Sequence, residues 1–197
     1  MLFIKPPKKL PFWVRVLIWI GDRAAGRKLM PPRILAHYPK ALVSSGVFEG
    51  LITHRDRQVP QRMLQLIRMQ VSFTVSCPFC IDMSSTEFQK NGITDAEIEA
   101  LQGINSLKSV SSFSQKERTA LLYVRAICST PLSFDADLIK EVKREFSERE
   151  IVIIASTAAQ VNYWTRLIQA FGIPPEGFND NCPVLKLDRF NPHRSER

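Results

Sequence analysis

The sequence predicts an all-α protein, a single-domain helical bundle. No segment between turn signals alternates apolar and polar residues with a period of two, as a half-buried strand would. Several stretches instead repeat apolar residues every three or four positions, which is the period of one helix face. Capping boxes, in which Ser or Thr is followed three residues later by Glu, mark three helix starts. The boxes are Thr94/Glu97, Ser114/Glu117 and Ser147/Glu150.

The first 30 residues (1–30) differ from the rest and are predicted to form a basic, aromatic arm or helix. Lysines precede an apolar run that imitates a signal peptide, but the run has only about 11 residues, too few to span a bilayer, and Arg15 interrupts it. We expect a retained helix that packs on the chain's own core or on a neighbouring subunit. Peripheral membrane contact through residues 10–20 is the less favoured alternative. At helical spacing the apolar face is Trp13, Val16, Leu17, Ile20 and Ala24.

Between the arm and the first capping box, four helices are predicted. Pro39 separates the first two, and Pro60 opens the third, because proline is welcome in a first helical turn. The fourth starts at the cysteine pair, runs through Lys90 and stops at Asn91-Gly92, a C-terminal cap signal. The first three ranges are 33–38, 40–53 and 61–76.

The second half continues the helical pattern. Asp135 is predicted to cap one more helix between the second and third capping boxes. The last helix runs from Glu148 to Phe171 and ends at Gly172. The helical domain is therefore expected at 31–178, with a C-terminal tail at 179–197.

Composition places the chain among ordinary globular proteins. With 197 residues, of which 45% are hydrophobic and 23% charged, it can build a core without disulfide staples. The net charge of +8 is spread along the chain without zinc-finger spacing or an aromatic RNA-binding signature, so no nucleic-acid partner is expected. Four cysteines, only two of them close together, favour a reducing, cytoplasmic setting over a secreted disulfide scaffold.

Cys77-Pro78-Phe79-Cys80 is the motif that carries chemistry. Half of a zinc site is one interpretation, but zinc needs two more nearby ligands, and Cys128, Cys182 and the three histidines are scattered. Two thiols buried as small hydrophobic groups are a second interpretation. Thiol–disulfide exchange is the third and is favoured, because a spacing of three puts both sulfurs on one helix face within bridging reach. The first turn of a helix also stabilises a thiolate through its dipole and its unpaired N–H groups.

Several stretches of this chain together match the pattern of a known family. Three of them are Gln65-Leu-Ile-Arg-Met-Gln-Val71, Cys77-Pro-Phe-Cys-Ile-Asp-Met83 and Gly92-Ile-Thr-Asp-Ala-Glu-Ile-Glu-Ala-Leu101. A fourth is Asn162-Tyr-Trp-Thr-Arg-Leu167, followed by Gly172-Ile-Pro-Pro. They resemble the alkylhydroperoxidase D-like proteins of the carboxymuconolactone decarboxylase superfamily, and the resemblance covers roughly residues 35–178.

This resemblance implies an all-helical fold that assembles as homotrimers or homohexamers, without a flavin, haem or other cofactor. It also implies a peroxidase mechanism, in which Cys80 attacks a hydroperoxide and Cys77 resolves the resulting sulfenic acid to a disulfide. A dithiol reductant, such as a lipoyl group or a thioredoxin-like protein, would then reduce that disulfide.

Two positions depart from the family pattern. Active members of the family carry a histidine where this chain has Ser84 and a glutamate where it has Gln65. Those two residues form a relay that deprotonates the attacking thiol and protonates the leaving alkoxide. Serine and glutamine form hydrogen bonds, but neither titrates near neutral pH. Loss of a positioned base typically costs a factor of about 10²–10⁴, so we expect a poor peroxidase by the standard relay.

Three other side chains are candidates for a relay or site-lining role, and two of them have a structural alternative. Asp82 lies two residues after Cys80 and does not face it on a helix, so it is expected to be a first-turn acid that favours the helix dipole. His54, at the end of a predicted helix, is expected at the surface or as a C-terminal cap. Glu49 lies near the middle of that helix and could accept a proton.

Three functions therefore stay open. The leading hypothesis is an antioxidant-type thiol oxidoreductase that acts on a hydroperoxide or a small disulfide. The second is a non-catalytic redox-sensing or assembly protein, whose N-terminal arm contacts partners. Lactone decarboxylation, from which the superfamily takes its name, is the third and is disfavoured because those enzymes do not depend on a cysteine pair.

Overall fold

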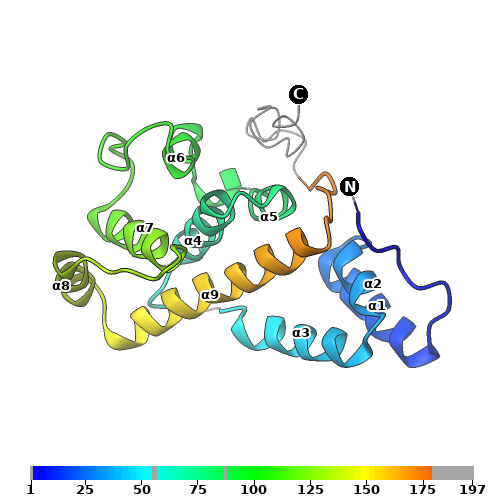
Figure 1. Ribbon diagram of the computed structural model, residues 1–197. Helices are drawn as coiled ribbons and strands as arrows, with labels where there is room; N and C mark the ends of the chain where they lie inside the picture. The colour runs from blue at the N-terminus through cyan, green and yellow to red at the C-terminus, as the bar shows by residue number, and fades with distance from the viewer. Residues whose placement is uncertain (1, 55–56, 87, 179–197) are drawn as a thin grey trace.

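The structure, a computed structural model, describes residues 2–54, 57–86 and 88–178 (Figure 1). These residues form α-helices and one short 3₁₀ helix and contain no strand, so the predicted all-α class is confirmed. The tail predicted at 179–197, with Cys182 and His193, lies outside the described residues. The helices are α1 (Phe12–Ala25), α2 (Met30–Leu35), α3 (Pro39–Ile52), α4 (Gln61–Thr74), α5 (Pro78–Ser84), η1 (Phe88–Asn91), α6 (Asp95–Leu101), α7 (Gln115–Ile127), α8 (Ala136–Glu145) and α9 (Glu148–Ala170).

Side chains cap the helices of the second half as predicted. At the start of α6, α7 and α9, the Ser or Thr oxygen accepts the N–H of the Glu three residues on, whose carboxylate accepts the cap N–H in return. Asp135 accepts the N–H groups of Asp137 and Leu138 and so caps α8. These bonds pair N–H groups that have no partner inside the helix, so the local sequence sets these four boundaries.

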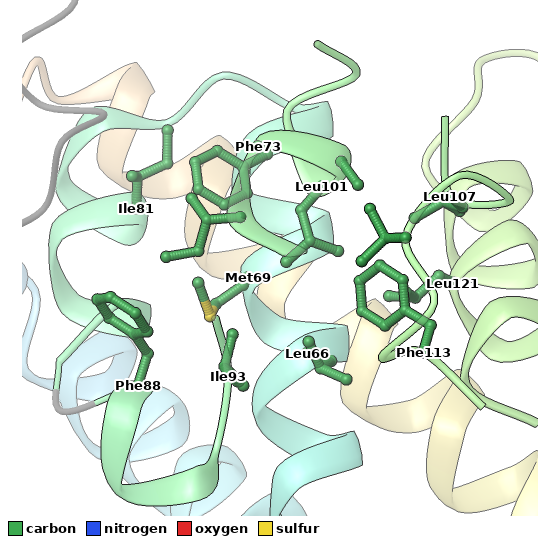
Figure 2. Close-up of a cluster of buried hydrophobic side chains, with 13 residues drawn as sticks. Leu66, Met69, Phe73, Ile81, Phe88, Ile93, Leu101, Leu107, Phe113 and Leu121 are labelled. Atoms are coloured by element: carbon green, nitrogen blue, oxygen red, sulfur yellow. The ribbon is translucent and has the colours of Figure 1, made fainter. Parts of the chain in front are cut away.

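Helix α4 is the centre of the bundle and packs against α5, α7 and α9 (Figure 1). One of its faces, with Leu66, Met69 and Phe73, lines a core that is completed by α5, η1, α6 and α7 (Figure 2). The opposite face, with Ile67 and Val71, packs on a second core made with α7, α8 and α9. Because both flanks of α4 are buried in apolar cores, only a narrow strip of this helix is left for polar side chains.

An ion cluster ties α4 to the neighbouring helices α6 and α7. The guanidinium of Arg62 lies 2.5 Å from Glu97 and 2.7 Å from Glu117. Ser112 adds a hydrogen bond to Glu97, whose side chain has no exposed surface. Each of the two glutamates also closes its own helix cap, so a single cluster fixes three helices relative to one another.

Helix α1 forms where the arm was predicted to be helical, but a different face packs on the protein. Val14 and Ile18 are buried against α2 and α3. The face predicted from helical spacing points outward, with Trp13 50% and Ile20 51% exposed. Of the two contacts predicted for that face, the one with the chain's own core is therefore wrong. The reason is that α1 is apolar on nearly every side, so periodicity could not select the face.

One further detail differs from the prediction. The helix predicted from the cysteine pair through Lys90 is interrupted, since α5 ends at Ser84 and η1 begins at Phe88, whose ring is buried in the core of Figure 2. Gly92 nevertheless adopts the left-handed conformation (φ +66°) expected of a cap.

Among the helices described, none combines the length and apolarity that a membrane crossing requires.

Candidate dithiol site

The turn between α4 and α5 positions the first cysteine. Ser76 adopts a left-handed conformation (φ +53°), and its N–H donates to the carbonyl of Phe73. The N–H of Cys77 donates to the carbonyl of Ser72 at 3.1 Å. This pair of bonds is a Schellman motif, which satisfies the last carbonyls of α4 and turns the chain directly into α5. Pro78, at the first position of α5, is compatible with that start because its N–H would have no helical partner.

Cys77 and Cys80 are joined as a disulfide, with their Cα atoms 5.3 Å apart. Cys77 caps α5, and its sulfur accepts the N–H of Cys80 at 3.3 Å. The predicted position of the pair at the start of a helix is therefore confirmed. Both residues are buried, Cys77 completely and Cys80 to 4% exposure. The apolar shell around them includes Ile34, Phe79, Trp164, Ile168, Phe171, Ile173 and Phe178.

Gln65 fastens the turn after α5 and is not free to act as a relay. Its side-chain nitrogen donates to the carbonyls of Ser84 (3.3 Å) and Thr86 (3.1 Å), and its oxygen accepts from Asn91. A glutamate at this position could not donate either of the first two bonds, because an ionised carboxylate only accepts. The glutamine is therefore explained by the packing of this turn.

Replacing Gln65 by glutamate is accordingly expected to lower the free energy of unfolding by about 1–3 kcal/mol, because a part-buried carboxylate would face two carbonyl oxygens. Urea denaturation followed by circular dichroism would measure the change. Gln61→Glu, at an exposed position of the same helix, is the matched control and should change stability by less than about 0.5 kcal/mol. Equal stabilities of the two variants would contradict this role for Gln65.

Ser84, at the other relay position, joins a chain of groups that do not titrate. Its hydroxyl donates to the hydroxyl of Ser72 at 3.3 Å, and Ser72 donates to the backbone carbonyl of Arg68 at 2.8 Å. Hydroxyls and carbonyls can hold each other in place, but they cannot take up a proton at neutral pH. Gln65 and Ser84 thus lie side by side, as the relay residues would, without supplying a base.

Glu49 reaches the site from α3. One of its carboxylate oxygens accepts the ring N–H of Trp164 and the amide of Gln160, each at 2.7 Å. Trp164 also packs against the apolar shell of the cysteines. Glu49 is itself exposed, so this side of the site lies at the protein surface. The contacts with Trp164 and Gln160 were not foreseen, since nothing in the sequence pairs α3 with α9.

Asp82 differs from its predicted role as a first-turn acid. It lies near the end of α5, has no exposed surface, and accepts the N–H groups of Glu176 (2.9 Å) and Phe178 (2.8 Å). Arg27 reinforces the same segment by donating to the carbonyls of Glu176 and Gly177. Phe178 then lies edge-on against Phe79, which sits between the two cysteines in sequence. Asp82 therefore holds residues 173–178 over the dithiol.

Asp82→Asn should loosen this segment, because an amide can accept only one of the two N–H groups. We expect amide hydrogen exchange in residues 173–178 to accelerate, consistent with a loss of about 1–3 kcal/mol of local stability. Asp137→Asn, which alters an exposed aspartate of α8, is the control and should leave exchange in the segment unchanged. Unaltered exchange in the Asp82→Asn protein would show that the carboxylate does not hold the segment.

The other candidate, His54, does not join the dithiol. Its ring bonds to the hydroxyl of Ser156 at 2.9 Å, near the N-terminal half of α9, whereas the cysteines pack against Ile168 near the C-terminal end. In the part of the chain that the structure describes, no group of three or more His, Cys, Asp or Glu side chains could hold a metal ion. Arg68, a part-buried arginine whose charge interacts with Glu49, was not singled out from the sequence. Its spacing of three from Gln65, on one predicted helix, was the available signal.

The profile of the carboxymuconolactone decarboxylase family matches residues 45–126. An uncharacterised protein of Bacillus subtilis, YdfG, is 30% identical to this chain over 109 residues, which are 55% of this chain and 72% of YdfG.

Two solved structures share the fold. An uncharacterised peroxidase-related protein from Ralstonia eutropha, with an alkylhydroperoxidase AhpD core, superposes with a TM-score of 0.72 at 17% sequence identity, covering 90% of this chain and 92% of its own. The debrominase Bmp8 superposes with a TM-score of 0.73 at 18% identity, covering 89% and 93%. At such low identities the likeness concerns the fold.

Proposed function

This chain belongs to the carboxymuconolactone decarboxylase superfamily as an alkylhydroperoxidase D-like protein, and from that premise we propose that it is a dithiol oxidoreductase. The observation that carries the proposal is the Cys77–Cys80 pair, bridged at the start of α5. A pair that closes within one helical turn can pass between the dithiol and disulfide states without moving the core helices.

In the proposed reaction, the thiolate of Cys80 attacks a hydroperoxide. The O–O bond breaks, an alkoxide leaves and takes up a proton, and Cys80 becomes a sulfenic acid. The thiol of Cys77 attacks that sulfur, the S–S bond forms, and water leaves. An external dithiol, such as a lipoyl group or a thioredoxin-like protein, then reduces the disulfide and is itself oxidised. A small disulfide could replace the hydroperoxide, with a thiol as the leaving group.

The assignment of Cys80 as the attacking residue agrees with burial, since Cys80 retains some exposed surface and Cys77 has none. Proton transfer would rely on water or substrate, because Gln65 and Ser84 offer no titratable group. We therefore expect peroxide turnover to be slower by about 10²–10⁴-fold than with a positioned base. The fold alone does not determine the substrate, since the structural neighbour Bmp8 is a debrominase.

The test is turnover of organic hydroperoxides and small disulfides by the reduced, full-length protein. Dihydrolipoamide and a reduced thioredoxin would serve as donors, and thiol titration would count two thiols lost per oxidant consumed. Formation of the Cys77–Cys80 disulfide without sustained turnover by any donor would contradict the enzyme proposal. If neither a hydroperoxide nor a small disulfide converts the reduced protein to the Cys77–Cys80 disulfide, dithiol chemistry is contradicted.

A non-catalytic redox sensor is the second candidate. It is favoured by one specific observation: the side chains at both relay positions form structural hydrogen bonds, Gln65 to the carbonyls of Ser84 and Thr86 and Ser84 to the hydroxyl of Ser72. In such a protein, oxidation of the dithiol would alter the segment that Asp82 holds over it. Rapid, stoichiometric oxidation that changes proteolysis of residues 173–178, without turnover, would favour this function.

A further inference from the structure

Arg68 lies on the strip of α4 that faces α5, the helix at whose start the dithiol lies. It is three residues after Gln65 and four before Ser72, so the three side chains share one helix face. Gln65 and Ser72 both contact Ser84 of α5, the helix that Cys77 caps. The flanks of this strip are closed by the two apolar cores. The charge of Arg68 interacts with Glu49 of α3, which bonds to Trp164 of α9, and Trp164 packs on the cysteine shell.

The guanidinium of Arg68 has no partner among the described residues, to which it donates no hydrogen bond and forms no ion pair. This is unusual for a half-buried arginine, because a desolvated charge is costly unless it is paired. Burial lowers the pKa of Arg68, while the nearby Glu49 carboxylate opposes that effect. Glu49 itself accepts hydrogen bonds from Trp164 and Gln160. The N–H donors of the Arg68 guanidinium are therefore not engaged by the described side chains, and none of its nitrogens is a buried atom without a partner, so they are accessible to a ligand.

The surroundings restrict which anion these donors would fit. Arg68 is a single positive charge with one acid, Glu49, in its electrostatic reach, which suits a monoanion better than a phosphate dianion. A guanidinium matches a carboxylate with two parallel hydrogen bonds. Glu49, which interacts with Arg68, also accepts the ring N–H of Trp164, and Trp164 packs with Ile168 on the cysteines. The side chains between Glu49 and the dithiol are therefore apolar, so the rest of the ligand would be apolar.

We propose that Arg68 binds the carboxylate of the substrate, whose apolar body carries the oxidised group toward Cys80. The substrate class is thus a hydroperoxide, or small disulfide, of an organic acid with an apolar chain. This inference rests on the proposed dithiol function for its reaction step, but the binding of the carboxylate does not depend on it.

The kinetic test compares a fatty-acid hydroperoxide with its methyl ester, which differs only in the charge of the head group. The wild-type protein should turn over the acid with a kcat/KM about 10- to 100-fold above that of the ester, the range expected for a charged hydrogen bond. Arg68→Gln should reduce this acid-to-ester ratio to near one, and Arg68→Lys should retain part of it. Arg166→Gln, an exposed arginine on α9, is the control and should keep the wild-type ratio. An acid-to-ester ratio of one in the wild type would overturn the proposal.

A binding measurement separates this inference from the proposed function. Isothermal titration of the full-length protein with decanoate, and with decanol as the uncharged probe, requires no redox step. Decanoate should bind the wild type about 10- to 100-fold more tightly than it binds Arg68→Gln, and decanol should bind both equally. This result, combined with absence of turnover, would refute the redox function and leave the carboxylate site standing. Equal decanoate affinity in wild type and Arg68→Gln would refute the site itself, provided that circular dichroism shows both folded.

Discussion

Cys80→Ser is expected to abolish turnover of hydroperoxides and disulfides, with a loss of at least about 10³-fold. A serine hydroxyl is not ionised at neutral pH and cannot form the S–S bond with Cys77 that completes the proposed cycle. The measurement is stopped-flow oxidation of the reduced protein by a hydroperoxide, followed by thiol titration. An unchanged rate in this variant would contradict the assignment of Cys80.

The other cysteines supply the matched controls. Cys77→Ser should still react once, and the sulfenic acid that accumulates on Cys80 should be trapped by dimedone, because no resolving thiol is present. Cys128→Ser should behave as the wild type. Cys128 is buried, and burial raises the pKa of its thiol although Asn162 donates a hydrogen bond to the sulfur. If Cys77→Ser instead loses its first oxidation and Cys80→Ser keeps it, the roles of the two cysteines are reversed.

Arg62→Met is expected to cause the largest loss of stability, about 2–4 kcal/mol. The substitution keeps the apolar stem but leaves the fully buried Glu97 side chain without its cation, and it removes the bridge to Glu117. The lower end of the range allows for the 25% exposure of the Arg62 side chain. Chemical denaturation at pH 7 would measure the loss. Arg144→Met, which removes a surface pair whose arginine is 67% exposed, is the control and should cost less than about 0.5 kcal/mol.

The same cluster predicts a pH dependence. Burial alone would raise the pKa of Glu97, but bonds from Arg62, Ser112 and the Thr94 N–H outweigh it, so the pKa lies below the usual 4.5. A lowered pKa in the folded state contributes stability that is fully present above the usual value and is lost as the pH falls through the folded-state value. The stability gap between wild type and Arg62→Met should therefore be widest above about pH 5 and narrow under acid. A gap that widens below pH 4.5 would contradict this account.

The structure accounts for the residue at one of the two relay positions more specifically than for the residue at the other. Gln65 is required as a donor by the carbonyls after α5, so its replacement of the glutamate is coupled to the packing of that turn. The Ser84 hydroxyl contacts the hydroxyl of Ser72 and the carbonyl of Ile81, and other small hydroxyl side chains could make the same contacts. In this chain, hydrogen bonds of Gln65 and Ser84 hold α5 and the turn that follows it against α4.

Local sequence determined the helix ends, because these depend only on interactions between residues that are close together in the chain. The capping boxes, the Asp135 cap and the left-handed glycine after η1 are interactions within a few residues of the chain, so their residue types and spacing predicted them. The position of the cysteine pair at a helix start belongs to the same class, because one turn and one proline produce it. The all-helical class followed from the sum of such signals.

Tertiary structure alone decided the rest, because the decisive contacts join residues far apart in the chain. The face of α1 that packs was selected by α2 and α3, since this helix offers apolar side chains on nearly every side. Asp82 was predicted to be a first-turn acid that favours the helix dipole. Its hydrogen-bond partners, the N–H groups of Glu176 and Phe178, lie about 95 residues later in the chain, so local sequence could not reveal them. Arg68 is one of several arginines in the sequence, and only its partial burial next to Glu49, without a hydrogen bond from its side chain to the described residues, distinguishes it. The sequence thus determined where the paired sulfurs of Cys77 and Cys80 lie, and the fold decided which groups surround them.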